Sequence, residues 1–306
     1  MSGAAPLLLS MDVEDWPQST WDRSLAITRR AADNTMRVLD ILATHRTRIT
    51  MFVLGKFAER FPAVVKRIRD DGHEIASHGF GHVEVFRQTP SEFVEDVARS
   101  IAVLEDICGT KVEGYRAPDF SIVRSTLWAL EALGELGLKY DSSIFPIGHR
   151  RYGIRDWPVL PSRIQLTGGR SLIELPIATA TIYGRRVPVA GGGYHRLLPS
   201  ALIQLAVRRS IAQGQPFVAY CHPYEFDSRE FHEIPIRIPL SVRLHQGLGR
   251  SRFQKKFERL VRSFRVELYR DTACRCGDVE IVSTDRFQRR DRCVLTEDGR
   301  RLAETG

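Results

Sequence analysis

The chain has 306 residues and a formal net charge of +8. Hydrophobic residues make up 43% of it and charged residues 27%, which are ordinary values for a globular protein and exclude a disordered or fibrous chain. A single α/β domain of roughly 200 to 250 residues with a large core would use most of this length. No apolar run approaches the roughly 18 to 20 residues needed to span a bilayer. No basic residue precedes the short apolar run near the N-terminus, so a signal peptide is not expected.

Segments of two kinds alternate along the first half of the chain. Short β-rich apolar runs are followed by longer runs with apolar residues at helical spacing, which is typical of an α/β protein with a mostly parallel sheet. Strands are predicted at 7–12, 48–54, 73–77, 112–116 and 140–145, and helices at 24–45, 57–71 and 121–136. A further helix is predicted to begin after Thr89, because Pro90 and Glu92 follow it in the pattern of a capping box.

The alternation is weaker in the second half. Pro and Gly are frequent between residues 146 and 193, where the strand predicted at 172–177 is short. A helix at 198–213 and a strand at 216–221 follow. Beyond Arg265 the sequence has mixed charge and little periodicity, so we expect an irregular C-terminal appendage.

Polar residues follow several of the predicted strands directly. They are Asp12, Glu14 and Asp15 after the first strand, and then His78, Arg116, Asp141 and His222. The carboxyl ends of parallel strands form one edge of a barrel or open sheet, and active sites form at that edge. We therefore expect these side chains to converge.

Two histidines, His78 and His82, stand four residues apart. Both imidazoles can reach one ion from a helix face or from a loop, although a surface pair on a loop is the alternative. The acids after the first strand would repel one another unless a cation or an arginine lies among them, and a solvated strand end is the alternative there. One carboxylate and two imidazoles would form a three-ligand hydrolytic metal centre with open positions for water.

Five segments, in this order, resemble the motifs of the polysaccharide deacetylases of carbohydrate esterase family 4, also called the NodB-homology family. They are residues 10–15, 77–82, 114–121, 140–143 and 220–223, within a span from about 7 to 226. The resemblance implies an α/β fold with a distorted (β/α) barrel of fewer than eight strands. It also implies one divalent metal held by an acid and two histidines, with Zn²⁺ expected and Co²⁺, Ni²⁺, Mn²⁺ or Fe²⁺ as alternatives.

The resemblance also implies roles for individual residues. Asp12 would be the general base that takes a proton from the attacking water, and Arg116 would pair with it. His222 would be the general acid, oriented by Asp141 or a neighbour. A backbone amide near Asp119 would help to stabilise the oxyanion.

The first motif departs from the family pattern, because Val13 follows the base where many members carry a second aspartate. Residues two apart in a strand share a face, so we expect Glu14 to join His78 and His82 as the third ligand. Asp15 is the alternative if a turn begins here.

Four residues are candidates for binding the substrate. Glycine lets a backbone approach a ligand, and aromatic faces pack on sugar rings, so Trp157 and Tyr194 are expected in the groove with Asp119 and Phe120. A simple turn role is the alternative for Trp157 and Tyr194.

The segment at 12–15 and those at 222–227 and 245–249 are similar to a branch of the family associated with bacterial exopolysaccharide synthesis. We therefore expect a deacetylase-like catalytic barrel at 1–235 and a basic C-terminal extension at 236–306, packed on or beside it. The implied reaction removes an N-acetyl group from a sugar of a surface polysaccharide, a glycoconjugate or its precursor. A deformylase or deacetylase of polyprenyl-linked sugars and an inactive carbohydrate-binding barrel are the alternatives.

Positive charge is concentrated in residues 237–265. Nine Lys and Arg stand there against one acid, Glu258, so this segment accounts for the entire net charge of +8. A solvated helix face is one interpretation, and contact with anionic lipid head groups or a phosphorylated substrate is the other. No nucleic-acid-binding motif accompanies the charge, so no nucleic acid partner is expected. We expect a cytoplasmic protein, with peripheral contact at the inner membrane as the alternative.

The five cysteines are expected to be reduced thiols, since their number is odd and no export signal is evident. Cys274, Cys276 and Cys293 are too poorly spaced for a zinc site, and no fourth ligand is evident.

Overall fold

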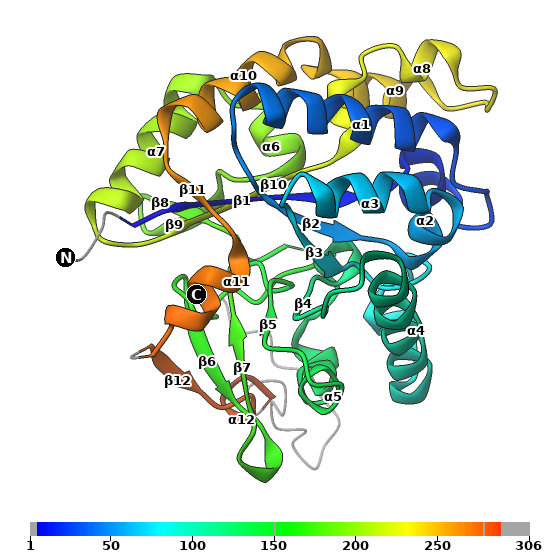
Figure 1. The fold of residues 1–306 in the computed structure, drawn as a ribbon. Helices are drawn as coiled ribbons and strands as arrows, with labels where there is room; N and C mark the ends of the chain where they lie inside the picture. The colour runs from blue at the N-terminus through cyan, green and yellow to red at the C-terminus, as the bar shows by residue number, and fades with distance from the viewer. Residues whose placement is uncertain (1–4, 150, 278, 289–306) are drawn as a thin grey trace, which may run out of the picture.

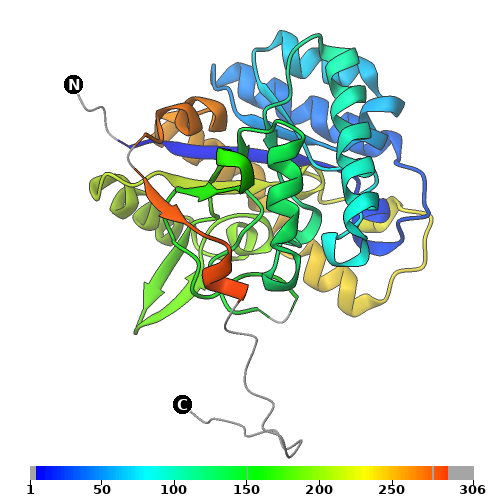
Figure 2. The ribbon, with the colours of Figure 1, turned by 90° about the horizontal axis from the view of Figure 1, so that it is seen from below.

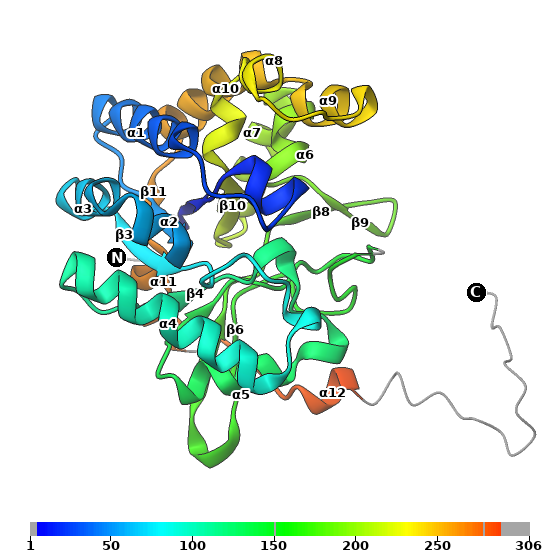
Figure 3. The same ribbon diagram turned by 90° about the vertical axis from the view of Figure 1, so that its right-hand side faces the viewer.

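The computed structural model describes residues 5–149, 151–277 and 279–288, which contain a ten-stranded sheet. Its strands are β1 (Leu7–Val13), β2 (Thr50–Val53), β3 (Glu74–Ser77), β4 (Gly114–Tyr115), β5 (Tyr140–Asp141), β6 (Ser162–Gln165), β7 (Ser171–Glu174), β10 (Phe217–Cys221), β11 (Val266–Glu267) and β12 (Glu280–Val282). The strands β8 (Thr179–Ile182) and β9 (Arg185–Pro188) form a separate antiparallel hairpin. This hairpin projects from the body of the molecule in Figures 2 and 3.

The core of the sheet is a run of parallel strands in the order β10-β1-β2-β3-β4-β5-β7. β6 pairs antiparallel with β7, and β12 follows parallel to β6. The Ala178 N–H donates to the Val218 carbonyl at 3.0 Å, so the chain after β7 contacts β10 and the run curls back toward its first strand. The predicted distorted barrel with fewer than eight strands is therefore confirmed for the described part of the chain.

Helices surround this sheet (Figure 1). They are α1 (Arg29–Thr44), α2 (Gly55–Arg60), α3 (Pro62–Asp70), α4 (Pro90–Cys108), α5 (Trp128–Glu135), α6 (Gly192–Leu197), α7 (Ser200–Ala212), α8 (Glu230–Glu233), α9 (Leu240–Gly247), α10 (Arg250–Ser263), α11 (Tyr269–Arg275) and α12 (Asp285–Gln288). Short turns of 3₁₀ or π type lie at Pro17–Trp21, Val85–Arg87, Pro118–Phe120, Arg124–Thr126, Thr167–Gly169 and Pro223–Phe226.

The central position of β1 follows from its composition. Every residue of Leu7–Val13 is buried, which is typical of a strand in a parallel sheet with both faces covered. β1 pairs with β10 on one edge and with β2 on the other, and β11 pairs with its first residues. The strand order thus places the residues that follow β1, β3 and β10 at one edge of the sheet.

The helix predicted to begin after Thr89 does so. The Glu92 N–H donates to Thr89 Oγ1 at 3.3 Å, and the Thr89 N–H donates to Glu92 Oε2 at 2.7 Å. These two bonds satisfy backbone donors that the first turn of a helix otherwise leaves unpaired. The helix ends at Gly109, whose φ of +64° suits glycine.

Two other helices differ from their predictions. The helix predicted at 57–71 is two helices, because the chain bends at Phe61 before Pro62, which begins α3 and has no N–H to continue α2. The helix predicted at 121–136 begins only at Trp128, after the 3₁₀ turn at Arg124–Thr126.

The C-terminal part is more regular than expected. Residues after Arg265 form β11, α11, β12 and α12 within the described ranges. Phe253, Phe257 and Tyr269 are fully buried in the same core as the strands. Residues 289–306, including Cys293, lie outside the described residues. Among the described helices, none combines the length and apolar character needed to cross a membrane.

Candidate active site

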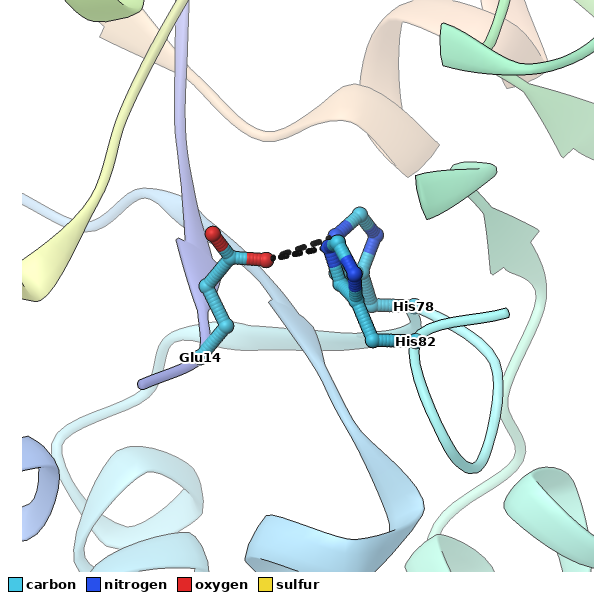
Figure 4. Close-up of side chains that lie close together, drawn as sticks. All are labelled: Glu14, His78 and His82. Carbon is cyan, nitrogen blue, oxygen red and sulfur yellow. Dashed lines mark ion pairs between the residues drawn. The ribbon is translucent and has the colours of Figure 1, made fainter. Parts of the chain in front are cut away.

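The three residues predicted to hold a metal lie together. Glu14 follows β1, and His78 and His82 lie in the loop after β3. Glu14 Oε2 is 2.7 Å from His82 Nε2 and 3.4 Å from His78 Nε2. Figure 4 shows both imidazoles directed at this carboxylate. One candidate ligand atom from each residue lies within 4.8 Å of the others, and all three side chains are buried.

The hydrogen bonding of His78 shows that this cluster suits a cation. Its Nδ1 is 2.9 Å from the backbone oxygen of Arg116, which can only accept, so Nδ1 carries the proton. In the neutral ring, Nε2 then directs a lone pair at the Glu14 carboxylate 3.4 Å away, and these two acceptors repel unless a cation or a proton lies between them. Fixing the other ring nitrogen on a carbonyl is typical of metal-binding histidines. The residues present therefore fit a divalent metal ion.

The electrostatics of the cluster are dominated by one carboxylate among imidazoles. Burial alone would raise the pKa of Glu14, but the charge of His82, with contributions from His78 and His222, holds this pKa well below its usual value. Burial would lower the pKa of His82, and the nearby Glu14 carboxylate outweighs it, so the pKa of His82 is raised. An anionic Glu14 is the form that binds a metal.

Asp15, the alternative ligand, points elsewhere. Its carboxylate accepts hydrogen bonds from the N–H of Thr28 at 2.5 Å and from Thr28 Oγ1 at 3.1 Å. It therefore ties the end of β1 to the start of α1. Of the two acids, Glu14 is the one that the structure places against the histidines.

Asp12 is held by a fully buried arginine. Arg116 Nη1 donates to Asp12 Oδ1 at 2.7 Å and to Ser10 Oγ at 2.8 Å. Its Nε and Nη2 donate to the backbone oxygen and the hydroxyl of Ser142, and Nη2 also donates to the Tyr269 hydroxyl at 3.1 Å. All five N–H donors of the guanidinium thus have acceptors, which is the condition for burying this charge. The sequence did not reveal Tyr269 as a partner, because it lies in the C-terminal part.

His222, which follows β10, faces the same cluster. Its Nε2 is 3.7 Å from Glu14 Oε1, so the two oxygens of Glu14 face different histidines. Burial would lower the pKa of His222, but the ion pair with Glu225 and the nearby acids Glu14 and Asp12 raise it to about 9. The imidazolium form can give up a proton.

Glu225, and not Asp141, contacts His222. Glu225 Oε2 lies 3.5 Å from His222 Nδ1 and accepts the His222 N–H at 3.1 Å, while Oε1 lies 3.5 Å from Arg196 Nη1. Burial would raise the pKa of Glu225, and His222 and Arg196 lower it overall. The spacing His-Pro-Tyr-Glu was the available signal, since a first-turn acid three residues after His222 can reach back to it.

The structure does not place Asp141 against His222. Glu225, which the sequence analysis did not name, holds that position. Asp141 Oδ1 instead accepts from Ser143 Oγ at 2.5 Å, and Ser143 Oγ accepts from the Ala117 N–H at 2.7 Å. Asp141 also stands opposite Glu174 in the β5–β7 register, and burial together with this neighbour raises the pKa of Glu174 well above its usual value. Asp141 thus supports the backbone next to Arg116.

Asp12 and His222 line one cavity of about 370 Å³ together with Glu14, His78 and His82. Arg116 and Asp141, the other two catalytic candidates, are fully buried and are not among its lining residues. Asp119, Phe120 and Tyr194 of the expected substrate groove also line the cavity, as do the unexpected Arg151 and His245. Arg151 donates to Asp119 Oδ2 at 2.5 Å. Further lining residues that the sequence did not single out for a role are His149, Tyr152, Tyr220 and Tyr224.

Trp157 does not line this cavity. It is fully buried, and its ring lies 4.5 Å from that of Phe287, measured between centroids. A Trp-Pro pair in a glycine-rich stretch predicts a turn. It cannot predict that the indole is covered by Phe287, because that residue lies far away in the C-terminal part of the sequence. The prediction of a groove role for Trp157 is wrong.

Three residues around the cavity adopt left-handed backbone conformations that are unusual for non-glycine residues. The φ values are +59° for His82, +54° for Asp119 and +52° for Phe120. Such conformations persist where the surrounding structure enforces them, often at functional sites. Here they coincide with a candidate ligand and with two residues of the expected substrate groove.

Two family models match successive parts of the chain. The polysaccharide deacetylase model matches residues 18–139, and a model described as a domain of unknown function (DUF3473) matches residues 142–273. The first range contains both histidines of the cluster and Arg116, and the second contains His222 and Tyr269. Asp12 and Glu14 precede both ranges.

Curated relatives agree with the first of these matches. The chain is 33% identical over 98 residues to a peptidoglycan-N-acetylglucosamine deacetylase of Bacillus cereus, covering 32% of this chain and 36% of the relative. It is also 33% identical over 85 residues to a chitooligosaccharide deacetylase of Azorhizobium caulinodans, covering 28% of this chain and 40% of the relative. The chain thus spans well under half of the length of these relatives.

Solved structures agree on the fold. A Mycobacterium smegmatis protein assigned to the polysaccharide deacetylases aligns over 99% of this chain and 98% of its own, with 20% identity and a TM-score of 0.56. An allantoinase, Puue, aligns over 88% of both chains with 14% identity and a TM-score of 0.57. At these identities the two likenesses show the fold alone. What the comparisons show of the family is the match of residues 18–139 to the polysaccharide deacetylases.

Proposed function

We propose that this protein is a metal-dependent hydrolase that removes the N-acetyl group from an N-acetylated sugar. The observation that carries the proposal is the meeting of three groups of residues at one cavity. They are the Glu14, His78 and His82 cluster, Asp12 with its buried partner Arg116 behind the cavity wall, and the His222–Glu225 pair. The cavity volume lies at the lower end of the range for small-molecule sites, which suits one or a few sugar rings.

Glu14, His78 and His82 would hold the metal. A divalent cation there would supply Lewis acidity toward the acetamide carbonyl and toward water, and we propose Zn²⁺ because two imidazoles and one carboxylate are a usual ligand set for it.

The remaining residues would move protons. Asp12 has one oxygen fixed by Arg116, which leaves its other oxygen to take a proton from water as the water attacks the amide carbon. His222 Nε2 would give a proton to the amide nitrogen as the C–N bond breaks, and Glu225 would hold the ring in position. One water is consumed, and free amine and acetate are formed.

The substrate class is taken from the named relatives. Those relatives are deacetylases of peptidoglycan N-acetylglucosamine and of chitooligosaccharides by name. We therefore propose an N-acetylglucosamine-type sugar within a surface polysaccharide, a glycoconjugate or its precursor. The resemblance of the front motif and of the segments after His222 to the exopolysaccharide-associated branch favours a role in exopolysaccharide synthesis, in the cytoplasm or at the inner membrane.

The test is acetate release from N-acetylated chitooligosaccharides together with metal analysis of the purified protein. We expect about one divalent ion per chain, loss of activity with a chelator and recovery when metal is returned. Asp12→Asn should lower kcat by a factor of about 10² or more, because it removes the proton acceptor. The exposed Asp22→Asn is the matched control and should keep kcat within about twofold.

Two results would contradict the proposal. Full activity in a His78→Ala, His82→Ala double variant would exclude the cluster as the catalytic centre. Tight sugar binding without acetate release, unchanged in Asp12→Asn, would instead indicate a carbohydrate-binding barrel.

A further inference from the structure

Helix α9 carries two exposed leucines, Leu240 and Leu244, and its C-cap residue is a third, Leu248; we call these three the leucine face. Their exposed fractions are 68%, 63% and 65%, and the spacing of four residues places Leu240 and Leu244 on one side of the helix. The other side packs through Val242 on the buried aromatic cluster that includes Trp16. The helix is therefore fixed to the body with an apolar side outward, and contiguous exposed apolar residues mark an interaction surface.

Helix α10 adds positive charge directly after the leucine face. Arg252, Lys255, Arg259 and Arg262 are exposed and spaced by three and four residues, so they lie along one side of α10 and form the basic stripe. None of the four makes an ion pair with an acid of the described residues, whereas Arg250 of the same helix is buried against Glu230. The opposite side of α10 is anchored by buried phenylalanines.

The two helices lie on the same side of the molecule. They are joined only by Leu248 and Gly249, and they lie together along one edge of the molecule in both Figure 1 and Figure 3, two views at right angles. This side also borders the cavity, because His245 and Gln246 of α9 line it with Leu197 of α6. Arg196 Nη2 donates to the His245 carbonyl at 3.1 Å and fastens α9 to α6 at this point.

We propose that the leucine face and the basic stripe dock this protein on a membrane surface that contains anionic lipids. An exposed apolar surface followed along the chain by cations that have no ion-pair partner among the described residues matches a bilayer interface, where leucines enter the boundary of the acyl chains and Arg and Lys contact the head groups. A protein partner would be expected to place acidic side chains against the basic stripe. The acids among the described residues of this chain form no ion pair with it. Docking brings the cavity to the membrane, where, if the proposed hydrolase function holds, a lipid-anchored sugar can reach it.

The test is flotation of the full-length protein with vesicles of phosphatidylcholine, with and without phosphatidylglycerol, at low and at physiological salt. We expect binding that needs phosphatidylglycerol and weakens with salt. The variant L240S/L244S/L248S should bind about tenfold or more weakly. The variant R252Q/K255Q/R259Q should lose a similar factor, most of it at low salt where charge attraction is least screened.

Matched controls lie elsewhere on the surface. Ile281→Ser removes a side chain of 67% exposure on β12, and R46Q/K66Q/K139Q removes the same number of exposed charges. Both should bind vesicles like the wild type. Absence of wild-type binding at low salt, or equal losses in variants and controls, overturns the proposal.

A separate measurement distinguishes this inference from the proposed function. Acetate release from a soluble chitooligosaccharide should be unchanged in L240S/L244S/L248S, so loss of docking and loss of chemistry appear in different assays. A second copy of the chain is the competing occupant of the leucine face, and light scattering without lipid tests it by measuring the molar mass of the protein in solution. A wild-type dimer that this variant converts to monomer would assign the face to a second copy of the chain and overturn the membrane proposal.

Discussion

Burying a charged side chain is costly unless each donor finds an acceptor, and Arg116 meets that condition. Its partners come from β1, from the segment after β5 and from α11. The guanidinium also lies 4.1 Å from the centroid of the Phe52 ring. Arg116 contacts segments that are far apart in the sequence, and it also holds the Asp12 carboxylate. The position of this carboxylate therefore depends on the correct packing of all these segments.

The role of Glu225 can be tested as that of a positioning residue. Glu225→Gln keeps an oxygen for the His222 N–H but removes the negative charge beside Nδ1, so we expect kcat to fall about 10- to 100-fold while KM changes little. The comparison is Glu233→Gln, an acid of α8 that pairs with Arg30 away from the cavity and should leave kcat within about twofold. A rise in KM at constant kcat would show that Glu225 serves substrate binding instead.

The buried His73 makes the free energy of unfolding depend on pH. His73 Nδ1 accepts the Ile49 N–H at 3.1 Å, and burial lowers the pKa of His73 to about 4. The unfolded chain therefore takes up this proton near pH 6.5 and the folded chain only near pH 4. Stability contributed by neutral His73 is complete above about pH 6.5 and is lost as the pH falls toward 4, by up to about 3 kcal/mol.

The measurement is the free energy of unfolding in denaturant between pH 7 and pH 4. His73→Gln should flatten part of the decline but not all of it, because burial also lowers the pKa of His195 to about 4. Exposed His232→Gln serves as the control and should keep the wild-type slope. An unchanged slope in His73→Gln would contradict this assignment.

At the scale of elements, the short strand β4 depends on a close approach of glycine to an aromatic ring. A Cβ on Gly114 would lie 1.9 Å from Cζ of Tyr140, and this ring is held by a hydrogen bond from its hydroxyl to Glu74 Oε1 at 2.8 Å. The ring cannot move aside without breaking a buried hydrogen bond. Gly114→Ala should therefore destabilise the protein by about 2 to 3 kcal/mol.

Gly277 provides the matched control for this substitution. A Cβ there meets no atom within 4 Å and its backbone is not left-handed, so Gly277→Ala should change stability by less than about 0.5 kcal/mol. Thermal unfolding of the two variants decides the point. Equal melting temperatures would mean that Tyr140 has another position available.

Local patterns predicted most elements because their signals are local. The Thr89 capping box, the apolar β1 and the strand before His222 are each encoded within a few neighbouring residues. The break between α2 and α3 was missed, although Pro62 restricts the residue before it and is a local signal for such a break. The hairpin of β8 and β9 was missed, because its alternation is weak and it pairs only with itself.

The candidate site shows where such reasoning stops. Glu14, His78 and His82 could be grouped because each follows a strand and their ligand chemistry is shared. Glu225 was missed although its spacing of three residues from His222 is a local signal. Tyr269 could not be assigned, since its role depends on a distant side chain, Arg116. Trp157 failed for the same reason, as its partner Phe287 is 130 residues further along the chain.

At the scale of the whole molecule, the described residues beyond 235 contribute to the core of the barrel instead of forming a separate unit. Phe253, Phe257 and Tyr269 are fully buried with the strands, and β11 pairs with β1. A chain ending at residue 235 should therefore lack a cooperative unfolding transition and show no acetate release. A folded, active protein of that length would show that the barrel at 1–235 is independent.

A milder variant separates loss of packing from loss of contact. Tyr269→Phe in the full chain keeps the ring in the core but removes the hydroxyl that accepts from Arg116 Nη2. It should fold, with a loss of about 1 to 3 kcal/mol from the unsatisfied donor. If Tyr269→Phe unfolds cooperatively and the chain ending at residue 235 does not, the defect of the shortened chain comes from the missing core residues.

The pairing of β1 with β10 has a consequence for synthesis of the chain. Leu9 and its strand partner Ala219 are 210 residues apart, so one edge of the largely apolar first strand stays unpaired until most of the polypeptide has been translated. At roughly 5 to 20 residues per second, that edge stays open for about 10 to 40 s on the ribosome. An open apolar strand edge is a template for aggregation, so a chaperone that shields the nascent N-terminal segment should raise the yield of this protein more than one that acts after release.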